Sequence, residues 1–212
     1  MWPISDQTQE LLDGAKQGDA EAAGQLLDRH RDALRRMVDM RMDRRIQQRV
    51  DASDIVQEVM IEANRRLGTY LENPVMPFHL WLRQMAKDRL IDAHRRHRGS
   101  GKRSVDREQA NVAPAAMDRS TLELAAQLCD PEMTPAAAAT MQELQKRFQA
   151  AIEELDEHDR EVVLMRHFEQ LSNSDVAQAL GLTEPAASMR YLRAMRRLRK
   201  LLGGTNEEDD TP

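Results

Sequence analysis

Cysteine, aromatic side chains and long apolar runs are all scarce in this chain of 212 residues. The single cysteine, Cys129, excludes an intramolecular disulfide and a zinc site made of several cysteines. No stretch approaches the roughly 18 consecutive apolar residues that cross a bilayer. The first ten residues have neither the basic nor the apolar segment of a signal peptide. We therefore expect a soluble, cytoplasmic protein that does not contact a membrane.

The apolar residues that are present favour helices. Aromatic residues make up 3% of the chain, whereas methionine occurs 13 times. Because β-sheets generally depend on aromatic and β-branched side chains, this balance predicts an all-α protein. The length allows one or two small domains, each with its own core.

Charge is distributed unevenly along the chain, which carries a net charge of −5. The first 30 residues contain six acidic and two basic side chains. Residues 83–107 contain nine Lys or Arg and three Asp, and residues 171–202 contain six basic and two acidic side chains. Two basic segments in an acidic chain predict two separate contacts with a polyanion.

Apolar periodicity predicts four helices in the first half of the chain. They are expected at residues 8–30 with an interruption near Gly18, at about 31–45, from an Asp51 cap to Gly68, and at about 78–97. The two prolines within residues 72–77 exclude a helix that continues through them. In the fourth helix an apolar stripe is expected to face inward, made of Leu82, Met85, Ala86, Leu90 and Ala93. The basic residues expected to lie off that stripe are Arg83, Lys87, Arg95 and Arg96.

Composition divides the chain into two expected helical domains. Residues 99–140 are rich in Gly, Pro, Ser and Ala, which predicts a flexible linker that would span about 35 Å on average. Residues 203–212 form an acidic tail, which we expect to be disordered. The two domains are then residues 8–98 and 141–202, and the linker would let them occupy separate sites on one DNA duplex.

The second domain contains the pattern of a helix-turn-helix. A short helix over residues 174–180 is followed by Gly181 for the turn, Thr183 as the cap of a second helix and Pro185 in its first turn. The second helix leaves several side chains available to a major groove, and arginines near its start can bind guanine edges. An ordinary helical hairpin with a solvated basic face would show the same local pattern, so this motif leaves both interpretations open.

Three segments together resemble one known family. Residues 51–60, DASDIVQEVM, look like the region 2.2 signature of the sigma-70 family of transcription initiation factors. Residues 78–96, FHLWLRQMAKDRLIDAHRR, are similar to the region 2.3–2.4 helix of its extracytoplasmic-function (ECF) group, and residues 155–202 are similar to region 4. The motifs occur in the family's order, with a linker between them, and cover more than half of the chain.

The resemblance implies a non-enzymatic initiation factor whose partners are core RNA polymerase and promoter DNA. The polar side of the third helix would bind the β′ clamp of the polymerase, with Asp54, Gln57 and Glu58 as the candidate residues, and the β subunit is a further implied contact. The loop over residues 73–77 corresponds to the segment that captures a flipped base of the −10 element, which needs a shaped pocket. Members of the family are often held inactive by an anti-sigma protein, which is a further candidate partner.

The resemblance also implies two sets of DNA contacts. At the −10 element, Asn73 and Met76 would contact the flipped base, with Tyr70 as a neighbouring stacking candidate, and Trp81 matches a family position that is usually in the core. The basic residues that would hold phosphates around it are Arg83, Lys87, Arg95 and Arg96. The candidate contacts with the −35 element are Ala186, Ser188, Met189, Arg190, Arg193 and Arg197.

Other kinds of site have little support in the sequence. Asp54 and Glu58 could suggest a metal site or an acid–base pair, and His94 and His97 could begin a zinc site, but no further ligand lies at a usable spacing from either pair. We therefore expect no metal, no cofactor and no enzymatic activity. One rival function is a stand-alone helix-turn-helix regulator that never binds polymerase, which leaves residues 51–60 unexplained. The other is a helical adaptor for an acidic protein, which predicts no preference for any DNA sequence.

Overall fold

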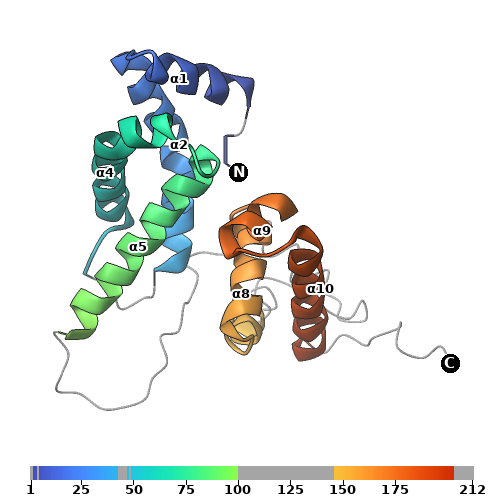
Figure 1. The fold of residues 1–212 in the computed structure, drawn as a ribbon. Coiled ribbons are helices and arrows are strands. Elements are labelled where there is room, and N and C mark those ends of the chain that lie inside the picture. Colours follow the sequence, from blue (N-terminus) through green and yellow to red (C-terminus); the bar gives the residue numbers. More distant parts are fainter. Residues whose placement is uncertain (1, 4, 43–46, 48, 100–145, 203–212) are drawn as a thin grey trace, which may run out of the picture. The chain divides into compact units, whose positions relative to one another are not determined.

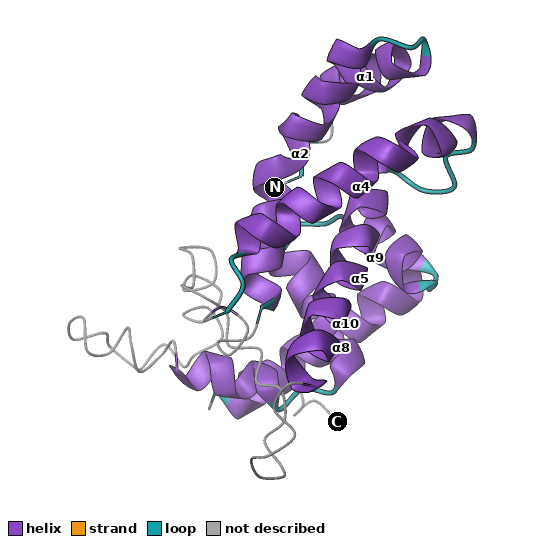
Figure 2. Ribbon diagram, turned by 90° about the vertical axis from the view of Figure 1, so that its left-hand side faces the viewer, coloured by secondary structure: helices purple, strands orange, loops and turns teal. Residues whose placement is uncertain are grey.

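The computed structural model describes residues 2, 3, 5–42, 47, 49–99 and 146–202 (Figure 1). Every regular element within these ranges is a helix, which confirms the predicted all-α class (Figure 2). The helices belong to two compact units, one within residues 1–115 and the other within residues 116–212. The predicted linker beyond Gly99, with Cys129, and the predicted acidic tail lie outside the described residues. None of the described helices has the length and apolar character needed to cross a membrane.

The described helices of the first unit are α1 (Asp6–Lys16), α2 (Ala20–Arg41), α4 (Ala52–Glu72) and α5 (Phe78–Gly99). α2 packs against α1, α4 and α5, and α4 also packs against α1 and α5. α2 and α4 each begin after an aspartate whose side chain accepts backbone N–H groups of the first turn, namely Asp19 and Asp51. The interruption predicted near Gly18 and the predicted Asp51 cap are therefore confirmed.

Two predicted helix boundaries in this unit are wrong. Residues 20–41 form one helix instead of two, because His30 continues the apolar face and is only 1% exposed. α4 continues past Gly68 to Glu72. An exposed glycine inside a helix costs only about 1 kcal/mol, and Leu67 and Tyr70 on either side of it are buried. In both places the packing of neighbouring side chains decides where the helix ends.

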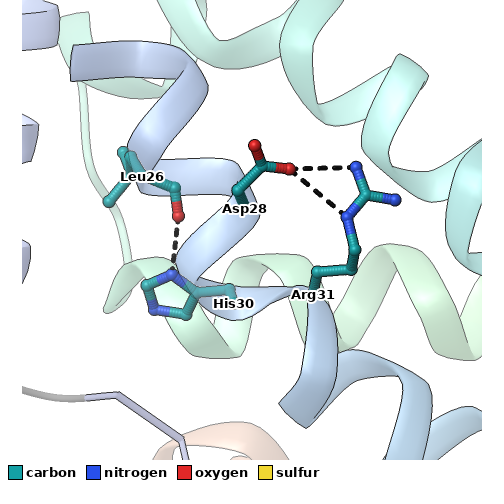
Figure 3. A network of polar contacts seen from close by, with 4 residues as sticks. All are labelled: Leu26, Asp28, His30 and Arg31. Carbon is teal, nitrogen blue, oxygen red and sulfur yellow. Dashed lines mark hydrogen bonds and ion pairs between the residues drawn. The ribbon is translucent and has the colours of Figure 1, made fainter. Parts of the chain in front are cut away.

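Residues that precede α1 contribute to the core of the first unit. Trp2 is 3% exposed, and its ring centroid lies 6.3 Å from that of His30 and 6.1 Å from that of His79. The Nδ1 atom of His30 is 2.9 Å from the carbonyl oxygen of Leu26, one turn earlier in α2 (Figure 3). The His30 ring also meets Phe78, the first residue of α5, edge-on at 5.0 Å. Trp2 of the N-terminal segment thus packs against both α2 and α5.

Polar contacts and one close approach attach α1 to α2. Arg29 of α2 donates hydrogen bonds to the side chains of Thr8, Gln7 and Ser5 at 3.2, 2.6 and 2.9 Å. Near the other end of α1, a Cβ atom placed on Gly14 would lie 2.9 Å from the Cβ of Ala22. The two helices therefore approach more closely there than a larger residue at position 14 would allow.

The second unit is arranged around its last helix. Residues 146–153 are helical and are followed by α8 (Glu157–Val163), the π-helix η1 (Leu164–Phe168), α9 (Asn173–Leu180) and α10 (Glu184–Leu201). α10 packs against α8 and α9. The core includes Phe148, Ile152, Val163, Ala194 and Leu198. The helix-turn-helix predicted from the sequence corresponds to α9, the turn at Gly181 and α10.

Candidate functional site

The outward face of α4 carries the residues that the sequence analysis assigns to polymerase binding. Asp54, Gln57 and Glu58 are all exposed, whereas Ile55 and Val59 of the same helix are buried. The Asp51 carboxylate fixes the first turn by accepting the backbone N–H of Ser53 at 2.7 Å. This hydrogen bond from the backbone also holds the pKa of Asp51 below its ordinary value. The structure therefore presents all three candidate side chains together on one accessible face.

Two open hollows lie along this face of α4. The first has a volume of about 420 Å³ and is lined by Asp54, Gln57, Glu58, Ile61, Arg49, Val50, Ile55, Ala93 and Arg96. The second has a volume of about 390 Å³ and is lined by Arg31, Gln57, Met60, Ile61, Asn64 and Arg65. Gln57 and Ile61 border both hollows, and Ile61 is 48% exposed. Sequence reasoning missed Ile61, although an isoleucine outside the buried stripe of its helix was a signal that could have found it.

Glu58 lies among cationic side chains of α5. Its carboxylate is 3.9 Å from a guanidinium nitrogen of Arg89 and 3.9 Å from one of Arg96. Arg89 also lies 3.9 Å from the carboxylate of Glu62. Ion pairs between exposed groups of this kind contribute at most about 1 kcal/mol each. A binding partner could therefore replace these ion pairs at little cost. Arg96, which is also a predicted phosphate contact, has the carboxylate of Glu58 as a neighbour in the free chain.

Aromatic side chains anchor the loop between α4 and α5. The Tyr70 hydroxyl donates to the carbonyl oxygen of Met76 at 2.9 Å, and its ring stacks on Trp81 with 4.7 Å between centroids. Burial raises the pKa of Tyr70, whose side chain is only 7% exposed. Tyr70 thus belongs to the core and positions the loop, which leaves Asn73 and Val75 exposed, Val75 to 69%. Met76 and Trp81 are half-buried, and Val75 is a loop residue that sequence reasoning missed.

The prediction that Arg83 lies off the apolar face of α5 is wrong. Arg83 is 2% exposed and shares the buried face with Leu80 and Leu90. Because both α2 and α4 pack against α5, its buried face is wider than the single predicted stripe and includes position 83. Lys87 is half-buried, while Arg95 and Arg96 are exposed, so these three residues remain as the accessible part of the predicted −10 set of cations.

The turn between α9 and α10 is fixed by caps on both helices. Ser172 and Asp175 form a capping box at the start of α9, in which each side chain accepts the other residue's backbone N–H at 3.0 and 3.1 Å. Gly181 has φ 64° and ψ 34°, the left-handed conformation that glycine adopts without strain. Thr183 caps α10 by accepting the N–H of Ala186 at 3.3 Å. The predicted turn and cap residues are confirmed.

The predicted −35 residues lie on two sides of α10. Ala186, Met189, Arg193 and Arg197 are exposed, while Ser188 and Arg190 are half-buried. Arg197 donates to the backbone carbonyl oxygen of Glu154 at 3.2 Å. Burial raises the pKa of Asp159 in α8, whereas the positive charges of Arg193 and Arg190 act to lower it. Arg193 and Arg197 therefore remain exposed, although Arg197 also contacts the segment before α8.

A histidine–tyrosine contact, not predicted from the sequence, connects the π-helix to α10. The His167 ring nitrogen Nε2 and the Tyr191 hydroxyl are hydrogen-bonded, and the Arg166 guanidinium lies 5.7 Å from the centre of the Tyr191 ring. Arg166 also donates to the carbonyl oxygen of Leu171 at 2.7 Å. Burial lowers the pKa of His167 and raises that of Tyr191. This contact holds the π-helix that precedes the helix-turn-helix against α10.

Comparison with known families identifies both units. Residues 26–100 match the family described as "Sigma-70 region 2", and residues 145–198 match "Sigma-70, region 4". The two matches together cover more than half of the chain and occur in the order that its motifs indicate. The chain belongs to the sigma-70 family, as its resemblance predicted.

Individual relatives agree with this assignment. The chain is 26% identical over 194 residues to the ECF RNA polymerase sigma factor BldN of Streptomyces coelicolor, an alignment that covers 91% of this chain and 65% of the length of BldN. In fold it is similar to CnrH in its complex with the cytosolic domain of CnrY, with a TM-score of 0.57, 22% identity and coverage of 93% and 98% of the two chains. It is also similar to the sigma factor RpoE of Bartonella quintana in complex with the anti-sigma factor NepR, with a TM-score of 0.52, 18% identity and coverage of 96% and 100%.

Proposed function

We propose that this chain is a transcription initiation factor that binds core RNA polymerase and directs it to specific promoters without covalent chemistry of its own. The observation that carries the proposal is the presence of sigma-70 regions 2 and 4 on one chain, in that order. In each region, most of the residues predicted to make contacts are accessible.

Polymerase binding is proposed for the α4 face that contains Asp54, Gln57 and Glu58. Its two carboxylates and one amide would meet basic and polar groups of the β′ clamp, and the hollows on either side of Ile61 have room for side chains of the partner. The ion pairs of Glu58 with Arg89 and Arg96 are long and exposed, so binding would exchange them for contacts with the polymerase. The same exchange would free Arg96 for a DNA phosphate.

DNA binding is proposed for two places, one in each unit. The loop with Asn73 and Met76, held by Tyr70, would receive a flipped base of the −10 element. The cations Lys87, Arg95 and Arg96, farther along α5, would hold phosphates. α10 would enter the major groove of the −35 element, because the capped turn at Gly181 presents its first turns and its exposed face is rich in arginine.

Co-elution with core RNA polymerase in size-exclusion chromatography tests the proposal. The full chain is expected to elute with the core enzyme, and the double variant Asp54→Arg/Glu58→Arg is expected to elute alone, because charge reversal turns the contact with a cationic surface into repulsion. The matched control is Glu10→Arg/Asp13→Arg, which makes the same change in charge at exposed positions of α1 and should still co-elute.

Two outcomes would contradict the proposal in different ways. If the chain never co-elutes with core polymerase but binds DNA specifically, and does so equally well without residues 1–98, it is a stand-alone helix-turn-helix regulator. If both double variants co-elute as the unchanged chain does, the polymerase binds elsewhere and the α4 face is not the docking site.

We further propose that an anti-sigma protein regulates this chain. The support is the likeness in fold to RpoE, which was solved in complex with the anti-sigma factor NepR. A protein that co-purifies with the chain from its native cells should, once purified, prevent co-elution of the chain with core polymerase. A co-purifying protein that leaves this co-elution unchanged is not an anti-sigma factor.

A further inference from the structure

The exposed face of α10 carries three apolar side chains in a row. Pro185, Met189 and Leu192 follow one another at spacings of four and three residues, so they lie on one side of the helix. All three are exposed, Met189 to 54% and Leu192 to 46%. The other side of the helix is buried at Ala194 and Leu198. We call Pro185, Met189 and Leu192 the apolar stripe.

Basic side chains border the apolar stripe. Arg193 and Arg196 follow Leu192 within one turn, Arg199 and Lys200 continue the series, and all four are exposed. Glu184, at the start of α10, is the only acidic residue in this helix. An apolar stripe with a cationic border is complementary to a surface that has apolar groups between rows of negative charge. The major groove of DNA has this arrangement, because phosphates line its edges and thymine methyl groups lie on its floor.

The chemistry of the apolar stripe limits what it can recognise in that groove. Its side chains make no strong hydrogen bonds, so it cannot distinguish bases by their donors and acceptors. Of the two arginines nearest the start of α10, Arg190 is half-buried and Arg193 is exposed, and the positive charges of both act on the carboxylate of Asp159. Apolar contact in the major groove is made with the 5-methyl group of thymine.

The spacing along the helix also fits neighbouring base pairs. At about 1.5 Å per residue, Met189 and Leu192 are separated by about 4.5 Å along the axis of α10. Successive bases of a DNA strand are separated by about 3.4 Å. Two adjacent apolar side chains can therefore reach two adjacent base pairs, and Pro185 lies one turn earlier on the same line.

We propose that Met189 and Leu192 are specificity-determining residues that recognise the 5-methyl groups of thymines at neighbouring base pairs of the −35 element. This inference rests on the proposed function, because it takes α10 to enter the major groove of promoter DNA. The exposed arginines and Lys200 then hold phosphates and supply affinity that does not depend on sequence.

The test removes methyl groups from the DNA and side chains from the protein. Duplexes bound specifically by the full chain with core polymerase are selected from a random library, and each thymine bound by the second unit is replaced in turn by deoxyuridine, which lacks only the 5-methyl group. Binding should weaken about fourfold at each contacted thymine, the effect of one buried methyl group. Met189→Ala and Leu192→Ala should bind the thymine duplex at least that much more weakly. Each should also lose its sensitivity to deoxyuridine at one position.

A control variant and the contrary results separate this inference from the proposed function. Arg199→Ala should weaken binding to thymine and deoxyuridine duplexes equally. Sequence-specific binding that no deoxyuridine weakens would overturn the inference and leave the proposed function intact. If the two alanine variants lose core polymerase instead of DNA, the apolar stripe binds a protein and the inference is again overturned. If no specific DNA binding occurs with or without core polymerase, the proposed function itself is rejected.

Discussion

At the scale of single residues, a buried histidine should make the stability of the first unit depend on pH. His30 is 1% exposed and lies against Trp2 and Phe78. Burial lowers its pKa from 6.5 to about 4, although its hydrogen bond to the carbonyl oxygen of Leu26 acts in the opposite direction. His30 is therefore neutral near pH 7, and its ring serves as part of the apolar core.

Acid should destabilise the first unit through this side chain. Below about pH 6.5 the unfolded chain binds a proton at His30, whereas the folded unit binds it only near pH 4. The contribution of neutral His30 to the free energy of unfolding is therefore complete above about pH 6.5 and is lost as the pH falls from there to about 4. The loss across the whole window is about 3 kcal/mol. Urea unfolding followed by tryptophan fluorescence reports the first unit alone, because Trp2 and Trp81 both lie there. In His30→Phe the difference in stability between about pH 7 and about pH 5 should shrink by about 2 kcal/mol, and an unchanged difference would contradict the assignment.

Trp2 should contribute to stability as a core residue does. Replacing a buried tryptophan by alanine removes its contacts and leaves a cavity, which costs about 3 kcal/mol. Trp2→Ala should therefore lower the free energy of unfolding of the first unit by that amount, measured by urea titration with Trp81 as the reporter. Pro3→Ala keeps the carbonyl oxygen that accepts the Thr8 hydroxyl at 2.6 Å and should have a much smaller effect. Equal losses in the two variants would mean that the segment, and not the Trp2 side chain, supplies the stability.

At the scale of elements, the starts of helices were easier to predict than their ends or their buried faces. The starts at Asp51, Phe78 and Thr183 depend on caps and prolines that act within a few residues. The continuity of α2 through His30 and the burial of Arg83 depend instead on helices that pack from elsewhere in the chain. The amino-acid types within one helix do not show which other helices will pack against it.

The candidate site shows the same limit. Asp54, Gln57 and Glu58 were placed on the exposed side of their helix because the apolar residues around them form a regular stripe, and they are exposed. Ile61 and Leu192 were missed, because an apolar residue is expected to be buried unless the packing around it is known. Ile61 lies outside the regular buried stripe of α4, which was the one sequence signal for its exposure of 48%, whereas the 46% exposure of Leu192 becomes clear only from the fold.

The turn between α9 and α10 should depend on glycine because of its backbone conformation. Gly181 has a φ of +64°, and a Cβ atom added there would meet nothing within 4 Å, so only backbone strain opposes substitution. Gly181→Ala should destabilise the second unit by about 1 kcal/mol. Gly181→Asn should cost less, because asparagine tolerates this conformation. Hydrogen exchange of the α10 amides measures both effects, and equal protection in the two variants would contradict this explanation.

At the scale of the whole molecule, the distribution of charge matters more than its total. The net charge is −5, yet the last three turns of α10 are strongly basic. Repulsion from the acidic parts opposes non-specific attachment to DNA, while α10 supplies a local cationic surface. We therefore expect an affinity for DNA that depends strongly on salt.

Salt dependence gives a count of the phosphate contacts of α10. If Arg196 and Arg199 each neutralise one phosphate, Arg196→Ala and Arg199→Ala should each reduce the slope of log K against log salt concentration by about 0.9. Lys16→Ala removes one positive charge from α1 and should leave the slope unchanged. Fluorescence anisotropy with a labelled promoter duplex, titrated at several salt concentrations, measures the slopes. A reduction of the same size in Lys16→Ala would show that net charge, and not contact, sets the salt dependence.

The close approach of α1 to α2 also restricts how this sequence can evolve. Any side chain at position 14 would meet the Cβ of Ala22 at 2.9 Å, and Ala22 is itself buried. Asp13, the residue before it, is exposed, and its carboxylate accepts a hydrogen bond from the exposed Gln9 side chain at 3.1 Å, so its exchange should cost little. In a population of folded variants, glycine should therefore persist at position 14 while the outward-facing positions of α1 drift.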